Sequence, residues 1–166
     1  TQDVGNVPVF LAEVKQRLFD QAKQDWHSEL ESYSKLSLMK ECKSLLEPEK
    51  YLSYIYVNKY RTALSRLRCS AHCLNIEIGS RPNIEQAPRL CVLCLQFGET
   101  LVEDEYHFIM NCKQLNNLRN LYLPQPYLEK PTTENFISLF TPENIETVIG
   151  LSKYIYYSMK YINTIE

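Results

Sequence analysis

The 166-residue sequence has few glycines and no long apolar run, and each absence excludes a class of protein. Only 4 glycines and 8 prolines, in a chain that is 45% hydrophobic, argue against a disordered or low-complexity chain. The apolar runs are too short to span a bilayer, and no apolar leader opens the chain, so no membrane partner is expected. The sequence also has no Gly-rich phosphate loop, no nucleophile triad and no adjacent aspartates. We therefore expect no enzyme activity from it.

Acidic residues are missing from one long stretch, although the net charge of the whole chain is only −2. Residues 50–76 contain no acid, and their basic residues are Lys50, Lys59, Arg61, Arg66 and Arg68. Apolar side chains at helical spacing predict an amphipathic helix over residues 58–72. Basic side chains bind phosphates, and the nearby tyrosines could stack on bases. The pattern predicts that RNA or DNA contacts Lys59, Arg61, Arg66 and Arg68; the alternative is an ordinary helix with its tyrosines in the core.

The remaining pattern predicts a mostly helical chain. Residues 1–8 are expected to be a linker and residues 9–166 a single domain, in a chain that we expect to be a fragment of a longer protein. Helices are predicted from Pro8 past Leu30, over residues 34–47, from Thr133, and from Thr141-Pro142 to the end. Residues 74–78 alternate as a strand does. A capping box at Thr100 and Glu103 predicts a helix from Leu101 to Tyr122.

The cysteines carry the strongest chemical signal. The spacing Cys91-x2-Cys94-x12-His107-x4-Cys112 offers three thiolates and one imidazole, the ligands of a tetrahedral zinc ion. Gly98 lets the intervening segment turn back as a hairpin. His107 and Cys112 are five residues apart, which is 140° on an ideal helix, so the helix should loosen near Cys112. Four protein ligands indicate a structural zinc site (Zn2+) in a module of about residues 89–117, built around a small zinc-stapled β-hairpin.

Residues 59–112 resemble the C-terminal zinc region of reverse-transcriptase-like proteins of animal non-LTR (LINE-type) retrotransposons. The resemblance rests on the zinc ligands and on further matches at Lys59-Tyr60-Arg61, Ala63-Leu64, Arg68-Cys69-Ser70, His72, Leu74, Ile76-Glu77, Gly79, Asn83-Ile84, Arg89, Glu103-Asp104-Glu105 and Phe108. Ser80 stands where these proteins usually have Arg.

The resemblance implies a non-catalytic accessory module of a retrotransposon polyprotein. Its partners would be RNA or DNA and the remainder of the parent polyprotein. The metal-binding spacing of the cysteines indicates an intracellular, reducing compartment, in the nucleus or the cytoplasm. The alternative is a structural or protein-interaction domain that docks on a polymerase or another partner through its tyrosine faces.

Two further groups of residues stay open at this point. Cys42, Cys69, His72 and Cys73 could hold a second metal ion, or the cysteines could be small buried hydrophobes. His72 and Glu77 could form an acid–base pair, but a structural hydrogen bond between helix and strand is the simpler interpretation.

Overall fold

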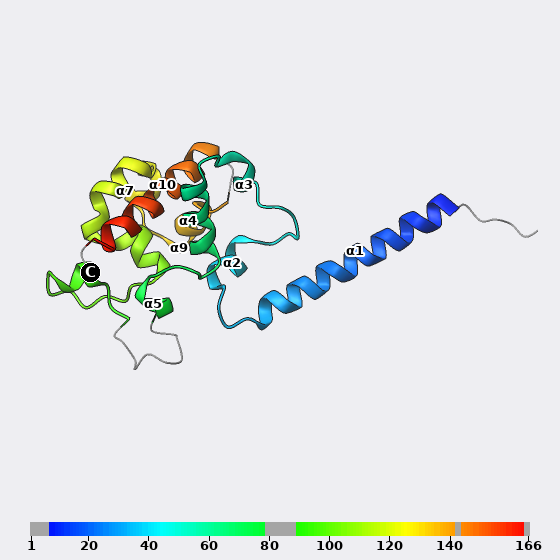
Figure 1. The fold of residues 1–166 in the computed structure, drawn as a ribbon, viewed down its shortest axis with the longest axis horizontal. Helices are drawn as coiled ribbons and strands as arrows, with labels where there is room; N and C mark the ends of the chain where they lie inside the picture. The colour runs from blue at the N-terminus through cyan, green and yellow to red at the C-terminus, as the bar shows by residue number, and fades with distance from the viewer. Residues whose placement is uncertain (1–6, 79–88, 142–143, 165–166) are drawn as a thin grey trace, which may run out of the picture. The chain divides into compact units, whose positions relative to one another are not determined.

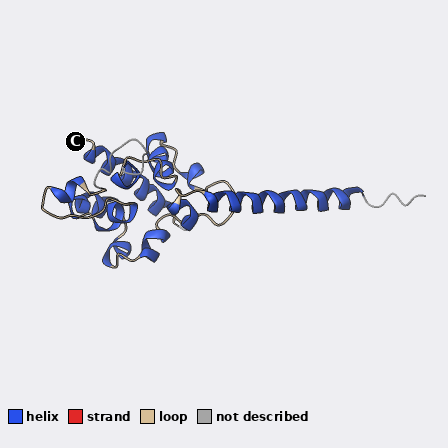
Figure 2. Ribbon diagram, turned by 90° about the horizontal axis from the view of Figure 1, so that it is seen from below, coloured by secondary structure: helices blue, strands red, loops and turns tan. Residues whose placement is uncertain are grey.

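The structure is a computed structural model that describes residues 7–78, 89–141 and 144–164. Two compact units, Thr1–Glu47 and Pro48–Glu166, are described separately. Within the described ranges the regular elements are helices, and Figure 2 shows no strand there. The prediction of a mostly helical chain is confirmed. None of the described helices combines the length and apolar character needed to cross a membrane.

The first unit contains α1 (Val7–Ser32) and α2 (Ser37–Cys42). The predicted first helix is confirmed, and the second ends at Cys42, earlier than predicted. The ammonium of Lys40 donates to Glu31 O and Tyr33 O at 3.1 and 2.8 Å, so a cation closes the C-terminal end of α1. The apolar side chains of α1 that are largely exposed include Phe10, Leu11 and Leu18.

The second unit is built around α10 (Ile145–Ile162), which packs on α3 (Tyr51–Tyr54), α4 (Asn58–Arg68) and α7 (Asn116–Tyr122). Figure 1 shows α10 in orange to red beside α4 and α7. The fully buried side chains of this contact include Leu64, Leu67, Leu151, Tyr154 and Ile155. Shorter helices complete the unit: α5 (Asn75–Ile78), α6 (Val92–Leu95), η1 (His107–Asn111), η2 (Lys113–Leu115), α8 (Gln125–Glu129) and α9 (Thr133–Ser138).

Gly150 sets how closely α7 and α10 approach. A Cβ at this position would lie 2.2 Å from Tyr122 O, a backbone atom that cannot move away cheaply. Gly150→Ala should therefore lower the free energy of unfolding by about 2 kcal/mol, even though alanine is the better helix former. Urea denaturation measures this effect. A variant as stable as the parent chain would contradict the close contact between the two helices.

Several sequence predictions need correction. Residues 74–78 do not form a strand, and Asn75–Ile78 form α5. Asn75 N and Ile76 N donate to Glu103, while Leu74 O accepts the helical bonds from Glu77 and Ile78. A β-hairpin is not seen in the described residues, where an isolated antiparallel bridge joins Leu90 and Val102.

The predicted ends of two elements also change. Residues 1–6 of the predicted linker lie outside the described residues, and Val7 and Pro8 already belong to α1. Pro142, predicted to begin the final helix, is likewise outside them; α10 has Asn144 as its N-cap, and the Asn144 side chain accepts from Glu146 N at 2.9 Å.

Candidate metal centre

The first two predicted ligands, Cys91 and Cys94, lie on a tight turn held by the Leu90–Val102 bridge. Cys91 N donates to Leu101 O at 2.8 Å, and Glu103 N donates to Arg89 O at 2.8 Å. These bonds bring residues 89–91 and 101–103 side by side. Between these two segments, α6 begins directly after Cys91 and places Cys94 one helical turn further along. Gly98, at φ +77°, then reverses the direction of the chain, as its position predicts.

The second two ligands lie at the two ends of a π-helix. Asp104 begins this segment, since its carboxylate accepts from His107 N at 2.7 Å. Cys112 N donates to His107 O at 2.7 Å, the i to i+5 bond of a π-turn. Because a π-turn is wider than an α-turn, His107 and Cys112 come to nearly the same side of the helix. The predicted loosening of the helix near Cys112 is confirmed, and it takes the form of the π-helix η1.

Arg119 fixes the end of this π-helix. Its guanidinium is buried and donates to Ile109 O at 2.6 Å and Cys112 O at 2.8 Å. These carbonyls belong to the last turn of η1 and to the cysteine that follows, where helical partners are missing. Arg119 also places a positive charge beside the backbone of Cys112, one of the four predicted ligands. The sequence reasoning missed this residue, because an arginine in a helical pattern is normally assigned to the solvent face.

The four predicted ligands come together with tetrahedral spacing. The Sγ atom of Cys112 lies 3.9 Å from the Sγ atoms of both Cys91 and Cys94, and Cys94 Sγ lies 3.4 Å from His107 Nε2. All four ligand atoms lie within 4.8 Å of one another. Zinc bonds of about 2.3 Å to sulfur and 2.0 Å to nitrogen place tetrahedral ligands about 3.8 Å (S to S) and 3.5 Å (S to N) apart. A disulfide needs about 2.05 Å, so the sulfur separations fit a metal ion better than an oxidised pair.

Burial and mutual hydrogen bonds drive the three thiol pKa values apart. The hydrogen bond from Cys112 lowers the pKa of Cys91 to about 3, although burial opposes this change. Burial raises the pKa of Cys94 to about 11, and the hydrogen bond to Cys91 raises the pKa of Cys112 well above the usual thiol range. Ionisation of all three thiols at these distances would therefore need a cation among them. This buried Cys3His group could hold a metal ion, for which zinc is a suitable choice.

The predicted capping box at Thr100 and Glu103 is wrong. The helix begins at Glu105 with Asp104 as its cap, while Glu103 is buried and accepts from Asn75 N at 2.9 Å. Burial raises the pKa of Glu103 to about 7, against the lowering effect of the Asn75 hydrogen bond. Glu103 thus joins the cysteine turn to α5 instead of capping a helix.

His72 is paired with a different carboxylate from the one predicted. Its Nδ1 accepts from Leu74 N at 3.3 Å, so Nε2 carries the proton that is donated to Glu105 Oε1 at 3.0 Å. Burial is the largest influence and opposes ionisation of Glu105, but the hydrogen bond from His72, a backbone hydrogen bond and the attraction of His72 together outweigh it and lower the pKa of this carboxyl. Glu77 lies in the same cluster. The pair ties the segment after α4 to the start of η1, which favours the structural interpretation.

The structure does not assemble the predicted second cysteine site. Cys69 and Cys73 are exposed, and Cys42 belongs to the other unit. Of the four residues proposed for that site, only His72 appears in a group with metal-binding spacing in the described part of the chain, together with Glu77 and Glu105.

The basic helix is confirmed as α4, and its four predicted contact residues divide by burial. Lys59 and Arg66 are exposed, whereas Arg61 is half-buried and donates to Asn58 Oδ1 in its own helix. Arg68 is only 1% exposed. Its guanidinium forms an ion pair with Glu49 at 3.0 Å and donates to Phe140 O at 3.1 Å. Arg68 therefore does not belong to the predicted nucleic-acid surface, because both terminal nitrogens of its guanidinium donate to groups inside the fold.

Tyrosines surround the exposed end of α4. Tyr60 and Tyr157 share a hydrogen bond of 3.0 Å between their hydroxyls, and the Lys59 ammonium lies 5.0 and 4.9 Å from the ring centres of Tyr60 and Tyr156. Tyr154, by contrast, is completely buried and donates its hydroxyl to Phe108 O. The aromatic side chains of α10 thus serve both the core and an exposed surface next to Lys59.

No protein family, curated protein or solved structure matches this chain. The resemblance to retrotransposon proteins accordingly stays a prediction from the sequence.

Proposed function

We propose that the second unit is a non-catalytic zinc-binding module. The four protein ligands Cys91, Cys94, His107 and Cys112 would complete a zinc tetrahedron and leave no position for water or substrate, which is typical of a structural site. The segment between residues 89 and 103, where the hairpin was expected, would supply two of the four ligands, Cys91 and Cys94. The tetrahedral spacing of the ligand atoms is the observation that carries this proposal.

The proposed role of this module is to hold RNA or DNA for other domains of a retrotransposon reverse-transcriptase-like polyprotein in a reducing, intracellular compartment. The resemblance around the zinc ligands supports the polyprotein context. The exposed cations Lys59 and Arg66, beside the tyrosines of α4 and α10, support the nucleic-acid contact. Arg61 lies on the same helix and is half-buried.

One observation favours the alternative of a protein-interaction domain. The exposed apolar side chains of α1, among them Phe10, Leu11 and Leu18, would suit a protein partner better than a phosphate backbone. In that case the chain would dock on a protein partner without touching nucleic acid.

A salt-dependent binding measurement tests the nucleic-acid contact. We expect the chain to bind RNA, single-stranded DNA or duplex DNA, and Lys59→Ala/Arg66→Ala to weaken all sequences similarly. Each lost phosphate contact should reduce the slope of log K against log salt by about 0.7 to 0.9. Fluorescence anisotropy at several salt concentrations measures both quantities.

The exposed Lys130 of the C-terminal end of α8 provides the matched control. Lys130→Ala should keep the affinity and the slope of the parent chain. Absence of binding to all three nucleic acids by zinc-loaded, folded protein would reject this function and leave the protein-interaction alternative.

A further inference from the structure

We propose that the groove between η2–α7 and the last turns of α10 binds an unpaired base of single-stranded RNA or DNA. This inference rests on the proposed nucleic-acid contact and names the site that would distinguish a single strand from a duplex. The groove has a volume of about 460 Å³, which is within the range of small-ligand pockets.

The walls of the groove are held in place before any ligand arrives. On one side Gln114 follows Cys112 by two residues, and its backbone N–H donates a hydrogen bond to the Cys112 thiol. On the other side Tyr157 of α10 stacks on Tyr122 of α7 with ring centres 5.6 Å apart and planes only 6° from parallel. Zinc binding and helix packing therefore fix the spacing between the two walls.

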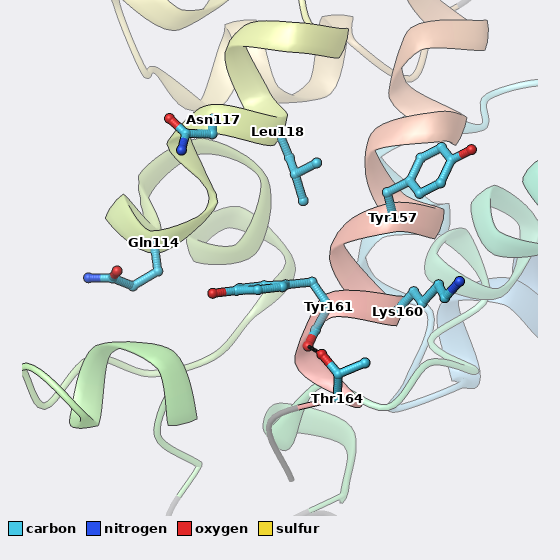
Figure 3. Close-up of a pocket in the computed structure, with 7 residues that line it drawn as sticks. All are labelled: Gln114, Asn117, Leu118, Tyr157, Lys160, Tyr161 and Thr164. Carbon is cyan, nitrogen blue, oxygen red and sulfur yellow. Dashed lines mark hydrogen bonds between the residues drawn. The ribbon is translucent and has the colours of Figure 1, made fainter.

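The side chains that line the groove suit a nucleobase. Figure 3 shows the Tyr161 ring lying across the gap toward Gln114, with Leu118 pointing into the same space. A tyrosine ring and a leucine offer flat apolar surface for stacking, which every base can use. The carboxamides of Gln114 and Asn117 each carry a donor and an acceptor, as the polar edges of bases require.

The charge of the groove suits the phosphate that accompanies a base. Lys160 belongs to the lining and is exposed, and the lining contains no acidic residue. In Figure 3 the Lys160 and Tyr157 side chains leave α10 on the same side, away from Tyr161. Because the Tyr157 hydroxyl bonds to Tyr60 of α4, that side continues to the exposed cation Lys59. When one base of a nucleic-acid strand lies in the groove, the phosphates of that strand could thus pass Lys160 and continue toward Lys59.

Binding of short oligonucleotides tests this site. The probes are a fluorescein-labelled eight-nucleotide RNA, the same sequence as DNA, and the DNA duplex, all titrated at one salt concentration. We expect tighter binding of the single strands than of the duplex. Tyr161→Ala should weaken single-strand binding about tenfold, in the range known for the loss of one base–aromatic stack, and leave duplex binding unchanged. Gln114→Ala/Asn117→Ala should act in the same direction, whereas Tyr161→Phe should retain the affinity because the ring remains.

Controls separate failure of this site from failure of the proposed function. Tyr33→Ala removes an exposed tyrosine of the other unit and should change nothing. Zinc content and melting temperature are measured for each variant, so that a misfolded variant is recognised. If Tyr161→Ala and Gln114→Ala/Asn117→Ala bind single strands like the parent chain while Lys59→Ala/Arg66→Ala does not, the groove proposal is wrong and the basic surface stands. If no probe binds the parent chain, both proposals fail.

Discussion

Removal of zinc is expected to unfold the Pro48–Glu166 unit. Structural zinc sites contribute on the order of 10 kcal/mol to folding, which is comparable to the whole stability of a small domain. The effect should spread beyond the ligands, because Tyr154 of α10 donates to Phe108 O in η1 and packs on the Phe108 ring at 5.6 Å between ring centres. A strong chelator should therefore abolish the cooperative melting transition and the near-ultraviolet dichroism of the tyrosines, and added zinc should restore both.

Two cysteine variants supply the matched comparison for this result. Cys112→Ser removes a buried ligand and should leave the purified chain with much less than one zinc ion per molecule. Cys69→Ser changes an exposed cysteine and should keep one zinc ion and the parent melting temperature. The ligand assignment is wrong if Cys112→Ser retains both its metal and its stability. Folded parent protein that contains no stoichiometric metal by elemental analysis would reject the zinc proposal itself.

The sequence predicted the candidate metal centre well, because its information is local. Spacing alone identified the four residues that the structure brings together, and helix geometry required a loosened turn between His107 and Cys112. The π-turn is the solution that lets residues five apart share one side. Helices were also predicted where apolar periodicity continued over several turns, as in α1, α4 and α10.

The sequence predictions are wrong where a residue distant in the sequence accepts hydrogen bonds from the backbone of the segment. Alternation over residues 74–78 is typical of a strand, but Glu103 accepts from Asn75 N with its carboxylate and from Ile76 N with its backbone carbonyl. The same use of Glu103 removes it from the predicted capping box, and Asp104 becomes the cap. Neither outcome follows from local propensity, because Asn75 and Glu103 are 28 positions apart in the sequence and meet only in the folded unit.

Arg68 shows a related limit of charge patterns. A stretch with several basic residues and no acid predicts a charged face, but it does not show which side chain finds a partner from another segment. Glu49 and Phe140 O provide those partners, one before α3 and one after α9. Within one helix, Arg66 is therefore a candidate phosphate contact, whereas Arg68 is a structural residue.

Arg68→Ala is accordingly expected to lower the free energy of unfolding by about 3 kcal/mol, because truncation removes the arginine donor from a mostly buried carboxylate and from a carbonyl. The side chain also covers the Tyr51 ring, at 5.4 Å from its centre, so packing is lost as well. Arg66→Ala, two residues earlier and exposed, should stay within about 0.5 kcal/mol of the parent chain. Urea denaturation of both variants, with nucleic-acid affinity measured on the folded fraction, distinguishes the two roles. If Arg68→Ala were as stable as Arg66→Ala and bound nucleic acid more weakly, Arg68 would belong to the binding surface after all, and its pairing with Glu49 would be dispensable for the fold.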